Sequence, residues 1–353
     1  MIGKNHMDAT GNQAFIFSRI KSMQEHLASK SDLYKPSNIW DEIKDSISVE
    51  LVTSDINSFK SQQVNKSMGL EFVGDSDDYK FACLSSAVNS NRQKNAIRRM
   101  HKFYNDRKDD RNITYVCMML DYAFYLADEL QTRVPAFNEP ELGSPLWVLY
   151  RDRRVTIDTV KSIIEYITFG RLLPDTACIA EVGGGYGRLA SLMLSTTQCT
   201  YFMFDIPPIL ALAEWYMGSL FPDSICPFSP ANDFHELERR MRGKRVIMLT
   251  PDQIELFPDR FFDSAINIDS FSEMKPASVM NYMSHLSRTL RPGGLFYLRN
   301  AREEALSRRG AATWACPGHE TYAPVPVDDF DFEINRLWPV YPAYFELLMR
   351  KRR

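Results

Sequence analysis

A run of glycines in the middle of the chain limits what the chain can fold into. Residues 181–188 read Glu-Val-Gly-Gly-Gly-Tyr-Gly-Arg, at the end of an apolar segment and before a stretch with helical periodicity. Glycine adopts backbone angles that other residues avoid, and it lets the chain pass close to a ligand. An apolar strand, a glycine loop and a helix in this order predict a βα unit of a parallel sheet, with a ligand at the loop.

Short apolar runs continue to alternate with helical stretches through the rest of the second half. This alternation predicts an α/β fold, in which a parallel Rossmann-like sheet carries helices on both faces. The expected strands are Cys178–Val182, Thr200–Asp205, Arg245–Leu249, Asp263–Asp269, Leu295–Asn300 and Tyr344–Arg350. The expected helices are Tyr186–Ser195, Pro207–Leu220 and Ala277–Arg291.

The first half of the chain has a different pattern, and residues 1–155 are expected to be almost wholly helical. Ala14–Ala28 and Tyr115–Leu130 have helical spacing, and Ser37 is placed to cap another helix. Between them, Arg92–Arg111 is basic, which indicates a solvated helix face or a dock for an anionic group of a substrate. The sequence therefore predicts a helical N-terminal domain, residues 1–155, and an α/β domain, residues 156–353.

Composition excludes several classes of protein. The net charge of -3 over 353 residues offers no overall attraction to nucleic acid or to anionic membranes. No run approaches the length of a membrane-spanning helix, and the polar N-terminus lacks the apolar stretch of a signal peptide. The six cysteines are scattered without metal-ligand spacing. We therefore expect a cytoplasmic protein with no membrane span, no nucleic-acid partner and no metal.

The spacing of the glycines distinguishes between possible ligands. A dinucleotide-binding loop needs a third glycine at position 188, where this chain has Arg188, and this argues against an NAD-linked oxidoreductase. Asp205 ends the next strand, 18 residues after Gly187, where a carboxylate can accept hydrogen bonds from both hydroxyls of a ribose. The same acid would also serve the ribose of NAD, so Asp205 supports a nucleoside ligand without choosing which one.

This loop resembles the first motif of class I S-adenosylmethionine-dependent methyltransferases. Pro258–Asp263 and Arg291–Gly294 resemble two later stretches of the same superfamily. The resemblance implies S-adenosylmethionine as cofactor, with Glu181 near its ammonium group. It also implies that Asp252 or Gln253 contacts the adenine; the alternative is that these two residues belong to an ordinary capped turn. The cofactor residues that it implies are Glu181, Gly183, Gly184, Gly185, Gly187, Arg188, Asp205, Ile206, Asp252, Gln253 and Asn267.

Residues 139–300 are similar, more narrowly, to the bacterial sugar O-methyltransferase family. Asp205-Ile-Pro-Pro208 and Ser272-Glu-Met274 are the most specific parts of this similarity. It implies a sugar or glycoside acceptor in polysaccharide, nucleotide-sugar or glycoside biosynthesis, methylated on a hydroxyl. The alternatives are another small-molecule hydroxyl, or a methyltransferase-like binding or scaffold protein without turnover. Nucleic-acid methylation of adenine is disfavoured, because Ile268–Phe271 lacks the Asn/Asp-Pro-Pro-aromatic motif.

A hydroxyl needs a base to accept its proton as the methyl group is transferred. Ligands of open α/β sheets bind beyond the carboxyl ends of the strands, which indicates Glu273 first and Asp269 second. The alternative for Glu273 is a helix N-terminal acid that complements the helix dipole. His319, near Trp314 and Tyr322, is a further candidate base, because an imidazole titrates near neutral pH; an uninvolved loop histidine is the alternative.

The helical N-terminal domain is expected to close the site. Methyl transfer proceeds best in a cleft that excludes water, and an open sheet supplies only one wall of such a cleft. We expect Leu142–Arg151, with part of the helical domain, to cover the site and contact the acceptor. The alternative is a remote oligomerisation domain, which would make the protein a homodimer.

Overall fold

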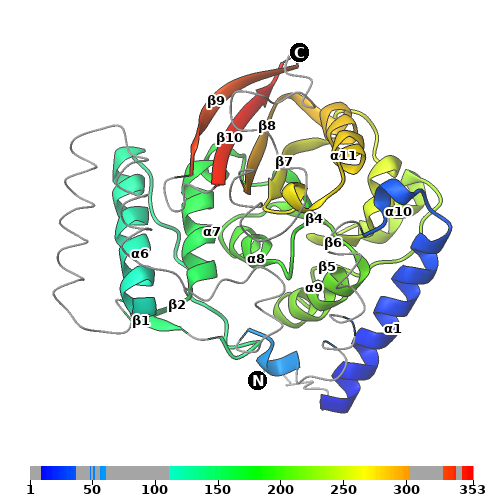
Figure 1. The fold of residues 1–353 in the computed structure, drawn as a ribbon, viewed down its shortest axis with the longest axis horizontal. Helices are drawn as coiled ribbons and strands as arrows, with labels where there is room; N and C mark the ends of the chain where they lie inside the picture. Colours follow the sequence, from blue (N-terminus) through cyan, green and yellow to red (C-terminus); the bar gives the residue numbers. More distant parts are fainter. Residues whose placement is uncertain are drawn as a thin grey trace.

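The computed structural model describes residues 9–36, 48, 51, 56–60, 111–145, 147–150, 152–301, 329–338 and 344–352. These residues form one eight-stranded sheet, a small two-stranded hairpin, and helices that cover both faces of the larger sheet (Figure 1). The architecture is the α/β fold that the sequence predicts, with helices on both faces of a largely parallel sheet.

The large sheet has the strand order β5-β6-β4-β3-β7-β8-β10-β9. Strands from β5 to β8 are parallel, and β10 lies antiparallel between β8 and β9. After β3, the chain adds β4, β5 and β6 on one side of β3. It then returns and adds β7 on the other side of β3, so β3 and β7 flank a topological switch point. The strands are β3 (Cys178–Val182), β4 (Thr200–Phe204), β5 (Ile225–Cys226), β6 (Val246–Leu249), β7 (Phe262–Ile268), β8 (Leu290–Ala301), β9 (Phe330–Leu337) and β10 (Tyr344–Lys351).

Successive side chains along each strand point to opposite faces of the sheet and fill two hydrophobic cores. In β3, Ile179 packs into the core beneath the helices α8 (Arg188–Thr196) and α9 (Pro207–Leu220). Its neighbour Ala180 packs into the opposite core, with α10 (Phe234–Met241) and α11 (Pro276–Thr289). Because both faces are buried, the central strands are continuously apolar, as parallel strands usually are.

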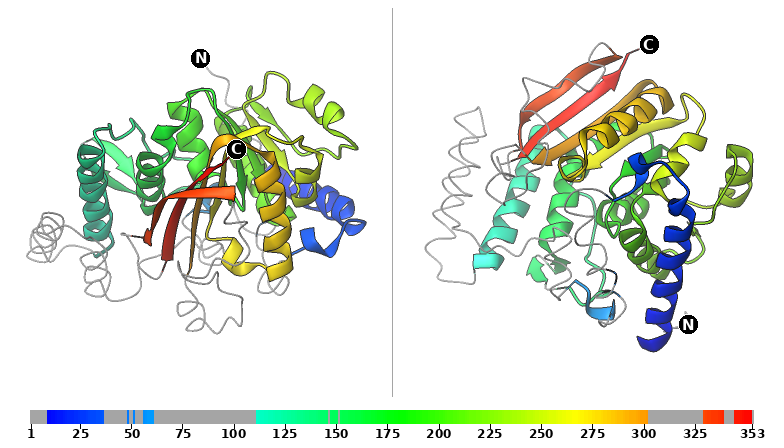
Figure 2. Two further views of the ribbon diagram at one scale, coloured as in Figure 1. Left: turned by 90° about the horizontal axis from the view of Figure 1, so that it is seen from above. Right: turned by 45° about the vertical axis from the view of Figure 1, so that its right-hand side comes forward.

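The N-terminal helix packs against the α/β part of the molecule. α1 (Ala9–Ala28) lies along α9, and the short helix η1 (Asp32–Tyr34) follows it and reaches α11 (Figure 2). Farther along, η2 (Ile56–Ser58) also contacts α1.

A second helical layer lies beyond α8. α6 (Arg111–Glu129) packs against α7 (Ile157–Thr168), which packs in turn against α8. No helix among the described residues is long and apolar enough to cross a membrane.

Most elements predicted from the sequence are confirmed, and several are corrected. The expectation of an almost wholly helical segment before residue 156 is wrong at β1 (Val148–Tyr150) and β2 (Arg153–Val155), which pair as an antiparallel hairpin. The turn expected at Arg291–Gly294 interrupts the register of β8, which passes from Leu290 opposite Phe262 to Leu295 opposite Ser264. α7, α10, β5 and β9 were not predicted. The helix expected after Ser37 and nearly all of Arg92–Arg111 lie outside the described residues.

Candidate active site

The glycine loop and the loop after β7 fit together at the switch point. Gly183 has φ +75°, and a Cβ on it would lie 2.1 Å from Oγ of Ser270. Asn267 holds the two loops in place, since its Nδ2 donates to the carbonyl of Val182 at 2.8 Å and to Oγ of Ser270 at 2.6 Å. Glycine at position 183 is therefore required by a close approach within the protein itself.

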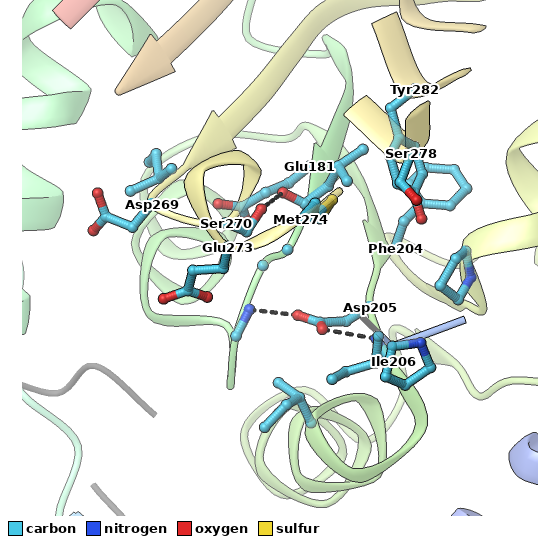
Figure 3. Close-up of a pocket in the computed structure, with 18 of the residues that line it drawn as sticks. Glu181, Phe204, Asp205, Ile206, Asp269, Ser270, Glu273, Met274, Ser278 and Tyr282 are labelled. Atoms are coloured by element: carbon cyan, nitrogen blue, oxygen red, sulfur yellow. Dashed lines mark hydrogen bonds between the residues drawn. The ribbon is translucent and has the colours of Figure 1, made fainter. Parts of the chain in front are cut away.

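Gly185 has a different role in the same loop. Its φ is +59°, and a Cβ added to it would meet no atom within 4 Å. The space in front of it belongs to a pocket of about 180 Å³, which is lined by the glycine loop, the ends of β4 and β7, and the segment Leu33–Pro36 (Figure 3). The loop backbone therefore forms one wall of this pocket.

Asp205 fixes the loop from the neighbouring strand. The backbone N–H of Gly185 donates to its Oδ2 at 2.8 Å, and that of Ile206 donates to its Oδ1 at 2.7 Å (Figure 3). Burial raises the pKa of Asp205 to about 7, although these two hydrogen bonds act in the opposite direction. Asp205 and Ile206 both line the pocket.

Glu181 lies beneath the loop and is almost completely buried. Tyr201 donates from its hydroxyl to Oε2 of Glu181 at 2.9 Å. Burial raises the pKa of Glu181 to about 7, and the nearby guanidinium of Arg188 counteracts part of this rise. The pocket is thus lined by two carboxyl groups, Glu181 and Asp205, that take up and release protons near neutral pH.

A chain of ion pairs runs along one end of the pocket. Arg188 donates from Nη1 and Nη2 to the two oxygens of Glu165, at 2.7 and 2.8 Å. Arg299 donates from Nη1 to the same carboxylate at 2.6 Å and from Nη2 to Oδ2 of Asp269 at 2.7 Å. Its guanidinium also stacks on the ring of Trp338 at 3.9 Å. Arg188, Asp269 and Arg299 all line the pocket.

The two candidate bases follow β7. Asp269 has φ +66°, and Glu273 ends the short helix η5 (Phe271–Glu273). Their carboxylates lie on the side of the pocket away from Tyr282 (Figure 3). His319, Trp314 and Tyr322 lie outside the described residues. Among the described residues, no group of three or more His, Cys, Asp or Glu side chains could hold a metal ion.

Four of the expected cofactor residues lie behind the pocket wall. The carboxylate of Asp252 is 2.9 Å from Nε2 of His26 and 3.2 Å from Nζ of Lys30, and Gln253 donates to the carbonyl of Ser229 at 3.1 Å. Neither Asp252 nor Gln253 lines the pocket, whereas the adjacent Pro251 does. Gly187 is the N-cap residue directly before α8, and Asn267 joins the two loops described above. Their roles toward the cofactor remain predictions.

The pocket also contains residues that the sequence did not indicate. Asp158 and Lys161 come from α7, and Asp158 accepts a hydrogen bond from the hydroxyl of Tyr186 at 3.0 Å. Arg299 was detectable in principle, because it lies near the carboxyl end of a predicted strand. Tyr34 also lines the pocket, and no pattern in the sequence connects it with the glycine loop about 150 residues later.

Comparison with known proteins identifies the family to which these features belong. The methyltransferase domain family matches residues 151–328, about half of the chain. The protein belongs to this methyltransferase family. The cofactor of this methyltransferase is S-adenosylmethionine, as the sequence predicts.

Several solved structures resemble the methyltransferase at low sequence identity. The PH0226 protein of Pyrococcus horikoshii OT3 is 16% identical, with a TM-score of 0.40 over 54% of this chain and 91% of its own. A methyltransferase from Mesorhizobium loti is 13% identical, with a TM-score of 0.38 over 53% of this chain and 97% of its own. The N-methyltransferase NodS of Bradyrhizobium japonicum WM9 is 13% identical, with a TM-score of 0.35 over 50% and 79%. No curated protein matches the sequence.

Proposed function

We propose that this methyltransferase transfers the methyl group of S-adenosylmethionine to a hydroxyl group of a sugar. One observation carries the proposal: a single pocket at the switch point brings together the glycine loop, Asp205, and the carboxylates of Asp269 and Glu273. The first two suit the cofactor, and the last two suit an acceptor that must lose a proton.

The charge of the pocket lining suits this cofactor better than a dinucleotide. The cationic side chains in the lining are Lys35, Lys161, Arg188 and Arg299, and both arginines are already paired with Glu165. The carboxyl side chains in the lining are Asp158, Glu181, Asp205, Asp269 and Glu273. The carboxyl groups can stabilise the sulfonium and ammonium groups of the cofactor, and the two arginines already neutralise Glu165 instead of facing a pyrophosphate.

Each part of the lining has a role in holding the cofactor. The open space at Gly185 lets the ligand approach the backbone. Asp205 lies where its carboxylate can accept hydrogen bonds from the ribose hydroxyls, and Glu181 lies beneath the loop, where it can attract the ammonium group. When bound there, the cofactor supplies a methyl group attached to a positively charged sulfur atom.

Glu273 is the residue to which we assign the acceptor's proton. It lies in the lining after the carboxyl end of β7, where an acceptor hydroxyl can approach the methyl group in line. Asp269 is less suited to this role, because both of its carboxylate oxygens are within reach of the Arg299 guanidinium, at 2.7 and 3.4 Å. We assign Asp269 to the binding of a neighbouring hydroxyl of the acceptor.

The choice of a sugar rests on the similarity of residues 139–300 to the bacterial sugar O-methyltransferase family. Carboxylates are acceptors that suit the several hydroxyl groups of a sugar ring. A hydroxyl of another small molecule is the alternative. The polysaccharides and glycosides of cells with the active protein should contain a sugar that is heavier by one methylene unit than in cells with Glu273→Gln, as measured by mass spectrometry.

The proposed function makes two separable claims. If the purified protein binds S-adenosylmethionine in calorimetry but leaves every glycan unchanged in mass, the sugar assignment is wrong and the methyltransferase assignment stands. If it binds NAD and not S-adenosylmethionine, both are wrong.

A further inference from the structure

The N-terminal strap, residues 9–36, is fastened to the methyltransferase domain along its whole length. Arg19 donates from Nε to the buried carboxylate of Glu214 on α9 at 2.6 Å, and from Nη2 to the carbonyl of Phe228 at 2.6 Å. At the start of the strap, Asn12 accepts a hydrogen bond from Nε1 of Trp215 at 3.2 Å. These buried contacts hold α1 in one position against the domain.

The second half of the strap is fastened to the loop after β6. His26 and Lys30 both contact the carboxylate of Asp252, which is itself almost completely buried. Tyr34 donates from its hydroxyl to Oε1 of Glu255 at 2.5 Å, and its oxygen lies 3.1 Å from Nε2 of His285. Asp252 therefore anchors the strap, and its carboxylate faces the strap instead of the pocket.

The end of the strap forms a wall of the pocket. Leu33, Tyr34, Lys35 and Pro36 line it together with Pro251, Phe204, Met274, Ser278 and Tyr282. The ring of Tyr34 lies edge-on to that of Tyr282, with 6.1 Å between the ring centres. Tyr282, Ser278 and Phe204 lie on the side of Asp205 away from Asp269 and Glu273 (Figure 3). Most side chains at this end of the pocket are apolar or aromatic, and its one charged side chain, Lys35, is paired with Asp32 at 2.9 Å, whereas the opposite end carries Asp269, Glu273 and Arg299.

We propose that the strap completes the adenine subsite of this methyltransferase, with Tyr34 as its main contact. The inference rests on the proposed cofactor. Asp205 marks the position of the ribose, so the flat base extends to one side and the amino-acid part to the other. The apolar, aromatic side suits a base, because every base has a face on which aromatic rings pack.

The strap is a part of the pocket wall that the matched methyltransferase domain does not contain. Residues 9–36 lie outside the matched region, residues 151–328, so the wall comes from a segment that the matched methyltransferase domain does not include. The adenine contact that the sequence assigned to Asp252 or Gln253 then passes to the strap, and Asp252 acts through the strap that it anchors.

Two soluble ligands test the inference on the full chain. S-adenosylhomocysteine carries both the adenosine and the amino-acid parts, whereas 5′-methylthioadenosine lacks the amino-acid part. Tyr34→Ala should weaken the binding of both ligands in calorimetry by about tenfold or more, as expected for loss of an aromatic contact to a base. Glu181→Gln, at the opposite end, is the matched control: it should weaken S-adenosylhomocysteine and leave 5′-methylthioadenosine within about twofold.

A measurement on the unaltered protein covers the case in which Tyr34→Ala does not fold. Both ligands should slow hydrogen exchange of the backbone amides of residues 31–35. Unchanged exchange in the presence of bound ligand, or a Tyr34→Ala variant that loses only S-adenosylhomocysteine, would overturn the inference. If the wild-type protein binds neither ligand, the proposed cofactor site fails and the inference fails with it.

Discussion

Arg299 and Asp269 are joined twice, once through side chains and once through the backbone. Nη2 of Arg299 donates to Oδ2 of Asp269 at 2.7 Å, and the backbone N–H of Asp269 donates to the carbonyl of Arg299 at 2.7 Å. Asp269 has a left-handed backbone at φ +66°, a conformation that costs free energy in a residue with a side chain. The double connection compensates for that cost and fixes the start of the loop that leads to Glu273.

Arg299→Met should therefore reduce kcat more than it affects cofactor binding. The variant leaves Asp269 without its guanidinium partner and lets the loop shift, and a small displacement of reacting groups lowers the rate by about 100-fold. The KM for the cofactor should change little, because the glycine loop and Asp205 remain. Steady-state kinetics with calorimetry of S-adenosylmethionine separates these effects.

Arg299→Lys is the matched control for this positioning role. A lysine keeps one positive charge near Asp269 and Glu165, so part of the lost kcat should return. If Arg299→Met keeps the wild-type kcat, or if the two variants lose kcat equally while both remain folded, Arg299 does not position the loop.

Glu273→Gln tests the assigned base directly. Glutamine keeps the shape of the side chain but cannot take up the acceptor's proton, so kcat should fall by about 100-fold or more. The dissociation constant for S-adenosylhomocysteine should stay within about twofold. Glu238→Gln is the control and should have wild-type kinetics, because Glu238 is an exposed glutamate on α10 that does not line the pocket. A wild-type rate in Glu273→Gln would leave the role to Asp269, to His319, or to no base.

The sequence predicted the parts of the fold that depend on local pattern. Cys178–Val182 and Pro207–Leu220 were predicted with the bounds that the structure gives, because a buried parallel strand is apolar throughout and a proline favours the first turn of a helix. β9 was not predicted, although Phe330, Phe332 and Ile334 alternate with polar residues in the pattern of a half-buried strand.

The candidate site was predictable only where its residues lie next to a motif. Glu181, Gly185 and Asp205 were found because each is close to the end of a recognisable strand. Asp252 also lies shortly after a predicted strand, but its carboxylate is held by His26 of α1 and by Lys30, which follows α1, both more than 200 residues earlier. Long-range pairings of this kind leave no periodicity in the sequence.

The lid that we expected is replaced in part by a different segment. Among the described residues of 142–150, none lines the pocket, and this stretch instead contacts the region of η2 through Ser144, whose Oγ donates to the carbonyl of Asn57 at 2.9 Å. Among the described residues before residue 156, those that line the pocket are residues 33–36. We therefore transfer the proposed role in covering the site from residues 142–151 to residues 33–36.

The glycines at positions 183 and 185 should respond differently to substitution by alanine. At Gly185 the added methyl group points into the pocket, so cofactor binding should weaken by at least tenfold while the strained backbone costs only about 1 kcal/mol of folding stability. At Gly183 the methyl group would overlap Ser270, so the main effect should be a lower unfolding temperature. Calorimetry and thermal unfolding of both variants check this. Equal effects on binding and stability at the two positions would contradict it.

Cofactor binding should release protons, because burial raises the pKa of both Glu181 and Asp205 to about 7 in the free protein. The cofactor's ammonium group beside Glu181, and the ribose hydroxyls that donate to Asp205, both favour the ionised carboxylates, so these pKa values should fall on binding. Below pH 7 each carboxyl group must then lose its proton, and affinity should rise as the pH rises from about 5 to 7 and level off above it. Calorimetry at pH 6 in two buffers of different ionisation enthalpy counts the protons released. Glu181→Gln should lower that count by up to one. A count of zero in the wild-type protein would show that neither carboxyl group changes its protonation when the cofactor binds.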